Sequence, residues 1–157
     1  MKRESLHILQ IGIAGCRWTG ERHYDETAAT AQVRVASIAD ADTETLSRRA
    51  DEWDVHSTFD DYTEIYEPAD LDAVVVAIPH DLHEDAVIQA TREGLPILCE
   101  KPIARTIAEA DRMIDAVNEC GVPLIVAESA RYEPRVRRVE EYLADGAIGH
   151  PVFTLYN

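Results

Sequence analysis

Short apolar runs alternate with amphipathic stretches along almost the whole of this chain. The apolar runs predict β-strands at residues 6–14, 33–39, 56–59, 72–78, 97–99 and 124–127. The stretches between them have helical spacing and predict helices at residues 19–30, 43–53, 61–66, 82–93, 106–120 and 134–143. This regular alternation predicts an α/β protein with a doubly wound parallel sheet.

Local patterns support several of these elements. The run 73–77, Ala-Val-Val-Val-Ala, is apolar on both faces, as a parallel strand covered by helices on each side must be. Thr106 and Glu109 have the spacing of a capping box that opens a helix. Gly94 and Gly121 stand where two of the predicted helices end.

The pattern predicts one domain at residues 1–145, without an internal repeat or a low-complexity segment. Gly146 and Gly149 then end the last helix, and residues 152–156 have the composition of a strand. Because no partner strand follows in the sequence, we expect residues 146–157 to be the linker and first strand of a second domain that this chain lacks. An unpaired apolar strand exposes an edge, so residues 152–156 are also a candidate oligomer contact.

The chain is strongly acidic. Thirty acidic and fifteen basic residues among 157 give a net charge of −15, which repels nucleic acids and anionic membranes at long range. No stretch is long and apolar enough to span a bilayer, and no secretory signal pattern follows the N-terminus. We therefore expect a cytoplasmic protein without nucleic-acid or membrane partners. The many acids and few lysines also resemble the composition of proteins from salt-loving organisms.

The cysteines and histidines predict no metal site. Cys16, Cys99 and Cys120 form no Cys-x-x-Cys pair, so neither a disulfide framework nor a zinc site is expected. We expect Cys99 and Cys120 to be small core residues. His80 and His83 lie three residues apart, but they lack the geometry of a known metal motif. A turn that lines a cofactor is the better interpretation of that segment.

A loop bounded by two glycines follows the first predicted strand. Its sequence, Gly-Cys-Arg-Trp-Thr-Gly, keeps the first and third glycines of the dinucleotide-binding fingerprint, with Arg17 in place of the second. Arg17 could crowd the pyrophosphate or bind it, and the following helix would hold phosphates at its N-terminus. The alternative is an ordinary strand–turn–helix without a ligand. The candidate cofactor-binding residues of the loop are Gly15, Cys16, Arg17, Trp18, Thr19 and Gly20.

Asp40 supplies the second half of this fingerprint. It ends the second predicted strand, 20 residues after Gly20. A carboxylate there accepts hydrogen bonds from both ribose hydroxyls of NAD and repels the 2′-phosphate of NADP. Asp42 adds to that repulsion, and no basic residue directly follows Asp40. NAD is therefore favoured over NADP, with helix capping as the alternative role of Asp40.

Lys101 is a candidate catalytic residue. It is one of only two lysines, and it follows the apolar run 95–99 in the tripeptide Glu100-Lys101-Pro102. In an open α/β sheet, ligands bind at the carboxyl ends of the strands. The alternative is a strand-end lysine that pairs with Glu100 or another nearby acid.

Taken together, these segments resemble the N-terminal domain of the glucose–fructose oxidoreductase/inositol dehydrogenase (Gfo/Idh/MocA) family. They occur in the order typical of that family and cover nearly the whole chain. The segments that carry the resemblance are residues 15–20 with His23, Asp40, residues 72–79 with His83, Glu100-Lys101-Pro102, residues 131–134 and residues 149–151.

The resemblance implies a Rossmann domain that binds NAD or NADP. It implies that Lys101 reaches toward both the nicotinamide and the reacting hydroxyl of the substrate, and that Glu100 orients Lys101 or the nicotinamide ribose. Ile78, Pro79 and His83 would line the nicotinamide side. The typical reaction of the family is hydride transfer between NAD(P) and a secondary alcohol of a sugar, cyclitol or polyol.

The resemblance also implies a second α/β domain that forms the substrate pocket and supplies an acid/base histidine. No histidine of this chain matches that residue. We therefore expect one of three things: the nucleotide-binding portion of an oxidoreductase, a non-catalytic NAD-binding module that acts with a partner chain, or a truncated remnant. A sugar or polyol substrate is expected only where a second domain is supplied.

Overall fold

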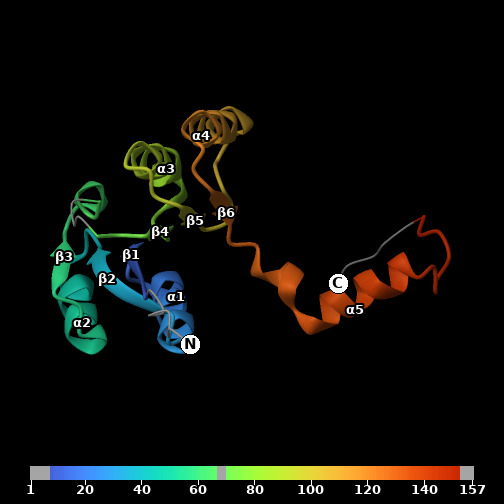
Figure 1. The fold of residues 1–157 in the computed structure, drawn as a ribbon, viewed down its shortest axis with the longest axis horizontal. Helices are drawn as coiled ribbons and strands as arrows, with labels where there is room; N and C mark the ends of the chain where they lie inside the picture. Colours follow the sequence, from blue (N-terminus) through green and yellow to red (C-terminus); the bar gives the residue numbers. More distant parts are fainter. Residues whose placement is uncertain (1–7, 67–69, 153–157) are drawn as a thin grey trace, which may run out of the picture. The chain divides into compact units, whose positions relative to one another are not determined.

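A parallel β-sheet organises the fold. The computed structural model describes residues 8–66 and 70–152. Within them, six parallel strands form one sheet in the order β3-β2-β1-β4-β5-β6 (Figure 1). The strand order reverses between β1 and β4, which is the switch point where sheets of this kind bind ligands. The predicted doubly wound α/β class is confirmed.

Strands and helices alternate as predicted, with bounds that differ from the predicted ones by a few residues at most. The strands are β1 (Leu9–Ala14), β2 (Val33–Ala39), β3 (Ser57–Phe59), β4 (Ala73–Val76), β5 (Ile97–Cys99) and β6 (Leu124–Val126). The α-helices are α1 (Trp18–Ala28), α2 (Thr43–Trp53), α3 (His83–Arg92), α4 (Ile107–Cys120) and α5 (Pro134–Ala144). Single turns of 3₁₀ helix are η1 (Tyr62–Glu64), η2 (His80–Leu82) and η3 (Ser129–Tyr132).

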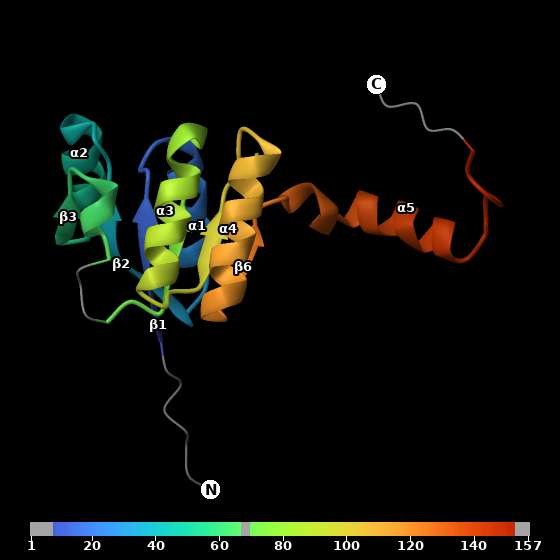
Figure 2. The same ribbon diagram turned by 90° about the horizontal axis from the view of Figure 1, so that it is seen from above.

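Helices cover both faces of the sheet. Figures 1 and 2 show α3 and α4 side by side on one face, with α1 and α2 on the other. Each layer closes a core of its own. Val87 and Met113 belong to the core on the α3–α4 face, and Leu46 and Trp53 belong to the core on the α1–α2 face.

Strand β4 contributes to both cores. Val74 and Val76 belong to the core on the α3–α4 face, whereas Val75 belongs to the core on the α1–α2 face. Val74 and Val76 are fully buried, and Val75 is 6% exposed. This two-sided burial is the reason that the sequence of β4 is apolar throughout.

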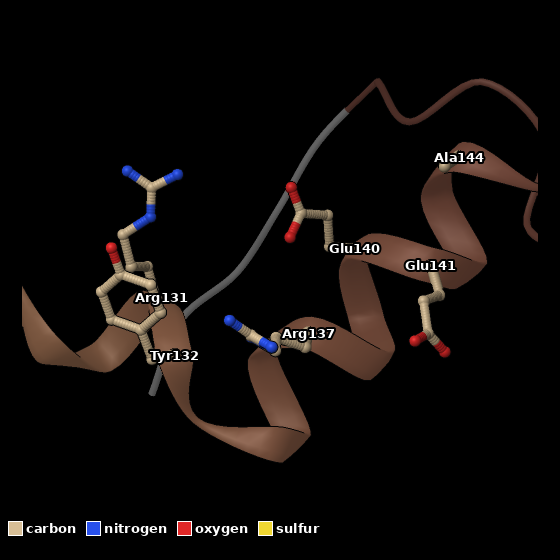
Figure 3. Close-up of a pocket in the computed structure, with 6 residues that line it drawn as sticks. All are labelled: Arg131, Tyr132, Arg137, Glu140, Glu141 and Ala144. Carbon is tan, nitrogen blue, oxygen red and sulfur yellow. The ribbon is translucent and has the colours of Figure 1, made fainter. Parts of the chain in front are cut away.

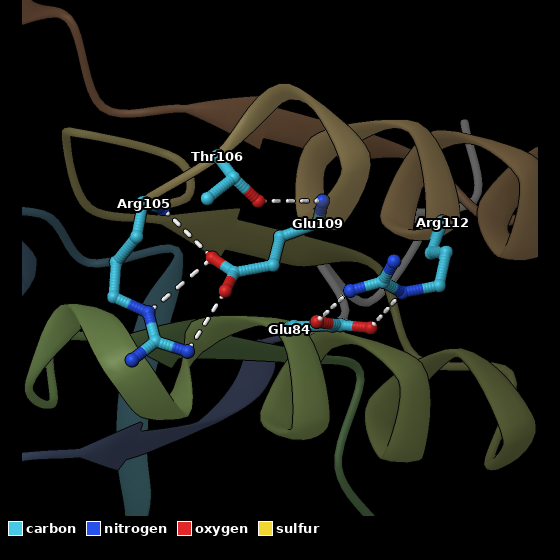
Figure 4. A network of polar contacts seen from close by, with 5 residues as sticks. All are labelled: Glu84, Arg105, Thr106, Glu109 and Arg112. Carbon is cyan, nitrogen blue, oxygen red and sulfur yellow. Dashed lines mark hydrogen bonds and ion pairs between the residues drawn. The ribbon is translucent and has the colours of Figure 1, made fainter.

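The start of α4 is held by a capping arrangement that differs in part from the predicted box (Figure 4). Thr106 Oγ1 accepts the backbone N–H of Glu109 at 3.1 Å, as expected. The Glu109 carboxylate, however, accepts the backbone N–H of Arg105 at 2.9 Å and also binds the Arg105 guanidinium at 2.8 Å. These bonds hold the pKa of Glu109 below its usual value. Close by, Arg112 of α4 donates to Glu84 of α3 at 2.8 Å, which ties the two helices together.

The chain divides into two compact units, residues 1–127 and residues 128–157. The sheet and the helices that cover it belong to the first unit. The second unit contains η3 and α5, an amphipathic helix that begins at Pro134 and whose residues are all exposed. The first compact unit therefore ends before α5, and the functional boundary expected at residue 145 stays a prediction.

Two further expectations need comment. Cys99 is buried as predicted, but Cys120 is exposed, so the prediction for Cys120 was wrong. Cys120 is the last residue of α4 and lies beyond Val117, the last buried position of that helix. The strand expected at residues 152–156 lies outside the described residues except for Val152, which is 94% exposed.

The cap of α4 gives a direct test of this description. Thr106→Ala should lower the free energy of unfolding by about 1 kcal/mol, because the backbone N–H of Glu109 loses its acceptor. Thr106→Ser keeps the hydroxyl oxygen and should restore most of the loss. Urea unfolding of the two variants followed by circular dichroism measures the difference. Equal stability of the alanine and serine variants would contradict a capping role.

Candidate functional site

A hollow, which we call the strand-end cavity, lies at the carboxyl edge of the sheet. Its volume is about 380 Å³. Gly15 follows β1, Asp40 follows β2, Asp60 follows β3 and Ala77 follows β4, so four strands each contribute a residue to its wall. The remaining lining residues are Arg17, Ala39, Ala41, Asp42, Asp61, Tyr62, Ile78, Pro79 and Leu82.

The two glycines of the first loop are required by close backbone packing. Gly15 has a φ of +93°, a conformation that side chains with L chirality rarely adopt. A Cβ on Gly15 would lie 2.3 Å from the carbonyl oxygen of Ala77. A Cβ on Gly20 would lie 1.8 Å from the carbonyl oxygen of Gly15. The loop backbone therefore packs directly against the end of β4 and the first turn of α1.

Arg17 replaces the second glycine of the fingerprint without distorting the loop. Its φ of −78° and ψ of −163° are an extended conformation open to any residue. Its side chain is 74% exposed, and its Nη2 lies 3.5 Å from Asp42 Oδ2. Arg17 therefore adds an exposed positive charge to the wall of the strand-end cavity.

Backbone amides hold the Asp40 carboxylate at the cavity. The N–H of Cys16 donates to Oδ2 at 2.8 Å, and the N–H of Asp42 donates to Oδ1 at 2.9 Å. Each oxygen keeps a lone pair for a further hydrogen bond. The cap of α2 is Asp42, which accepts the N–H of Thr45, so the capping role considered for Asp40 belongs to its neighbour.

Cys16 lies behind the loop and does not face the cavity. Its side chain is fully buried. Burial, with a smaller contribution from Asp40, raises the pKa of its thiol to about 12. The thiol is therefore neutral at physiological pH, and only the backbone N–H of Cys16 takes part in the site.

His83 supports the cavity wall from behind. It is fully buried; its Nε2 lies 3.0 Å from the carbonyl oxygen of Ile78, and its Nδ1 lies 3.2 Å from that of Ile103. Ile78 and the next residue, Pro79, line the cavity as expected. His83 is thus not among the residues that line the strand-end cavity, and its place on the nicotinamide side, which the resemblance implies, stays a prediction.

Lys101 lies at the end of β5, beside a pair of partly buried polar side chains. Its backbone N–H donates to Glu100 Oε2 at 3.0 Å, and Glu100 Oε1 lies 2.9 Å from His23 Nε2 on α1. The His23 and Glu100 side chains are only 15% and 18% exposed. Glu100 therefore holds the strand end against α1, while the side chain of Lys101 is exposed outside the lining of the strand-end cavity.

Not every predicted loop residue reaches the cavity. Trp18 is 70% exposed, with the guanidinium of Arg22 lying 5.4 Å from its ring centroid, and Thr19 is half-buried. Sequence reasoning in turn missed the lining segment 60–62, Asp-Asp-Tyr. That segment follows a predicted strand, and the rule that ligands bind at strand ends would have found it if it had been applied to β3.

A family model matches most of this chain. A model of the GFO_IDH_MocA oxidoreductase family, described as an NAD-binding Rossmann fold, matches residues 9–128. The chain belongs to the Gfo/Idh/MocA oxidoreductase family. The matched range contains the strand-end cavity, Glu100 and Lys101.

Individual Gfo/Idh/MocA relatives agree with this membership. Inositol 2-dehydrogenase 2 of Saccharopolyspora erythraea is 34% identical over 143 residues, which are 90% of this chain and 42% of that protein. D-xylose 1-dehydrogenase (NADP(+)) 2 of Haloferax volcanii is 30% identical over 136 residues, which are 87% of this chain and 42% of that protein. This chain thus spans about two fifths of the length of these relatives.

A solved structure shows the same fold. The oxidoreductase from Agrobacterium radiobacter, in complex with NAD+, L-tartaric acid and magnesium, has a TM-score of 0.86 to this chain at 24% sequence identity. The match covers 91% of this chain and 42% of the other. The arrangement of the sheet and its covering helices is therefore common to both proteins.

A second hollow, also about 380 Å³ in volume, lies within the second unit (Figure 3). The guanidinium of Arg137 lies 5.5 Å from the ring centroid of Tyr132 there. The residues that line it are all exposed: Arg131, Tyr132, Arg137, Glu140, Glu141 and Ala144. It offers no buried polar group and, unlike the strand-end cavity, no basis for a chemical role.

The described part of the chain lacks two further features. Residues 8–66 and 70–152 contain no group of three or more histidine, cysteine or acidic side chains placed to hold a metal ion. None of the helices in these ranges combines the length and the apolar composition that crossing a membrane requires.

The glycine packing predicts an order of stabilities. Gly20→Ala should lower the free energy of unfolding by about 3 kcal/mol, because the new Cβ would meet the backbone oxygen of Gly15. Gly94→Ala is the matched control, since it has open space around it and only a φ of +73° to oppose alanine. It should cost about 1 kcal/mol. Thermal unfolding measures both, and an equal loss for the two variants would contradict the packing argument.

Proposed function

We propose that the strand-end cavity binds NAD. We further propose that this chain is the nucleotide-binding portion of an oxidoreductase that transfers hydride between the nicotinamide and a hydroxyl of a sugar, cyclitol or polyol. The observation that carries the proposal is the convergence on one cavity of the loop at Gly15, the carboxylate of Asp40 and the turn at Ile78 and Pro79. Membership of the Gfo/Idh/MocA family supports the binding of a nicotinamide dinucleotide.

The residues present fit such a cofactor. The N-terminus of α1 has no side-chain cap, so its first amide groups are available to phosphate oxygens. Asp40 is held by two amides and has lone pairs left for the ribose hydroxyls. Apolar atoms of Ala39, Ile78 and Leu82 offer the wall that flat rings need.

Charge supports a preference for NAD over NADP. Arg17 is the one basic residue among those that line the strand-end cavity. Four carboxylates line it as well, those of Asp40, Asp42, Asp60 and Asp61. The additional 2′-phosphate of NADP would meet repulsion from these groups, whereas the ribose hydroxyls of NAD would find acceptors.

Lys101 is the proposed catalytic residue. The cofactor, when bound, supplies the hydride acceptor or donor. The ammonium of Lys101 would stabilise the negative charge that develops on the substrate oxygen as the alcohol loses its proton. Glu100 and His23 are proposed positioning residues, because their contacts fix the backbone of Lys101 against α1.

Turnover is proposed to need a substrate domain in addition to this chain. None of the described histidines lines the strand-end cavity, and the family resemblance assigns the acid/base histidine to a second domain. This observation favours, as the second candidate function, a non-catalytic NAD-binding module that depends on a partner chain. The two candidates share the cofactor site and differ in what completes it.

Cofactor binding is tested by calorimetric titration of the 157-residue chain with NAD and NADP. The chain should bind NAD more tightly than NADP. Asp40→Asn should weaken NAD binding about tenfold, because its NH₂ group would face one of the two amide donors and one ribose acceptor is lost. Asp25→Asn, an exposed position on α1, is the control for the loss of one charge. Absence of binding by the unaltered chain would overturn the cofactor assignment.

The role of Lys101 is tested in an assembly that includes the substrate domain. Lys101→Ala should lower kcat by about 100-fold or more, because the developing oxyanion loses its counter-charge. The affinity of the isolated chain for NAD should change far less than kcat. Lys101→Arg keeps the charge and should recover part of the rate. Unchanged turnover in Lys101→Ala would show that Lys101 is structural.

A further inference from the structure

Arg17 and Asp42 connect two loops at the rim of the strand-end cavity. Arg17 belongs to the β1–α1 loop and Asp42 to the β2–α2 loop, and both residues line the cavity beside Asp40. Arg17 Nη2 lies 3.5 Å from Asp42 Oδ2. The Arg17 side chain is 74% exposed and that of Asp42 is 39% exposed, so a ligand in the cavity can reach both.

The two partners of this pair differ in how firmly they are held. Asp42 is the N-cap of α2: its Oδ1 accepts the N–H of Thr45 at 3.5 Å, and its Oδ2 accepts the Thr45 hydroxyl at 3.0 Å. The hydrogen bonds from Thr45 lower the pKa of Asp42, so the carboxylate is ionised at neutral pH. Arg17 has no second ion-pair partner among the described residues. The helix cap therefore fixes Asp42, whereas nothing other than Asp42 holds the exposed side chain of Arg17 among the described residues.

We propose that Asp42 helps to exclude NADP by occupying Arg17, which would otherwise bind the 2′-phosphate. The inference rests on the proposed binding of NAD and adds to it separate roles for the carboxylates of Asp40 and Asp42. Asp40 selects NAD directly through the ribose hydroxyls. Asp42 acts through Arg17, because a guanidinium near the ribose site is the group that accommodates a 2′-phosphate in such folds.

The charges around the strand-end cavity make Arg17 the group that a 2′-phosphate would need for binding. Arg17 is the one cation of the cavity lining, so a phosphate that enters there has no other charged side chain of the lining to bind. While Arg17 is paired with Asp42, a 2′-phosphate must displace a carboxylate that the helix cap holds in place. Without the charge on Asp42, the same guanidinium is free to make a charge-assisted hydrogen bond to phosphate.

The test measures the Kd of NAD and NADP by calorimetry on the 157-residue chain, at an ionic strength of about 0.1 M. Asp42→Asn removes the charge and keeps an oxygen that can cap α2, since Asn and Asp are comparable N-caps. The double variant Arg17→Ala/Asp42→Asn tests whether any gain in NADP affinity depends on Arg17. Glu44→Gln removes a charge from the same turn of α2 at a residue outside the cavity lining. Melting temperatures confirm that each variant is folded.

Asp42→Asn should tighten NADP binding about tenfold, the effect expected of one charged hydrogen bond. The double variant should lose that gain, and Glu44→Gln should change NADP binding by less than about twofold, since it alters only a screened charge. A gain that persists in the double variant would show simple relief of repulsion and would overturn the inference. An equal loss of NAD and NADP affinity in the double variant relative to Asp42→Asn would overturn it too, because Arg17 would then bind the shared pyrophosphate.

The inference can fail separately from the proposed function. Binding of NAD by the unaltered chain, together with unchanged NADP affinity in Asp42→Asn, would reject the role of Asp42 and leave the NAD site standing. Absence of NAD binding by the unaltered chain would reject both.

Discussion

The contact of backbone with backbone at the end of β1 is the constraint on which the rest of the site depends. Gly15 turns with a positive φ directly against the carbonyl of Ala77, and Gly20, in the first turn of α1, lies directly against the carbonyl of Gly15. No side chain fits at either position. This contact brings the first turn of α1 and the ends of β1 and β4 together beside the strand-end cavity. A ligand can then approach amide groups that side chains would otherwise cover.

The acidic rim follows from the same turn. The N–H of Cys16, the residue after Gly15, is one of the two amides that hold Asp40. The place of the carboxylate is therefore set by the loop as well as by β2. On the opposite wall, His83 fixes the carbonyl of Ile78 from the buried side. Main-chain groups thus hold residues of both walls of the strand-end cavity in place.

The sequence predicts this architecture well because burial leaves a clear pattern. Strand β4 supplies both cores and is apolar throughout, and glycine is required where backbones touch, at Gly15 and Gly20. Features that depend on pairing across loops left weaker signals. The carboxylate of Glu109 accepts the backbone N–H of Arg105, which the capping-box pattern did not predict. The pairing of Arg17 with Asp42 joins segments 25 residues apart. The burial of His83 could not be inferred either, since a histidine five residues after the predicted strand 72–78 suits a ligand and a buried hydrogen bond equally.

The pair of His23 and Glu100 links the two parts of the proposed chemistry. His23 belongs to α1, the helix whose N-terminus is the proposed phosphate site, and Glu100 stands directly before Lys101. Oε1 of Glu100 pairs with His23, and Oε2 accepts the backbone N–H of Lys101. Within the described residues, the Lys101 ammonium has no hydrogen bond or ion pair, and Glu100 instead holds the main chain that carries it. The anchored backbone, with an ammonium that Glu100 does not bind, supports the catalytic role proposed for Lys101.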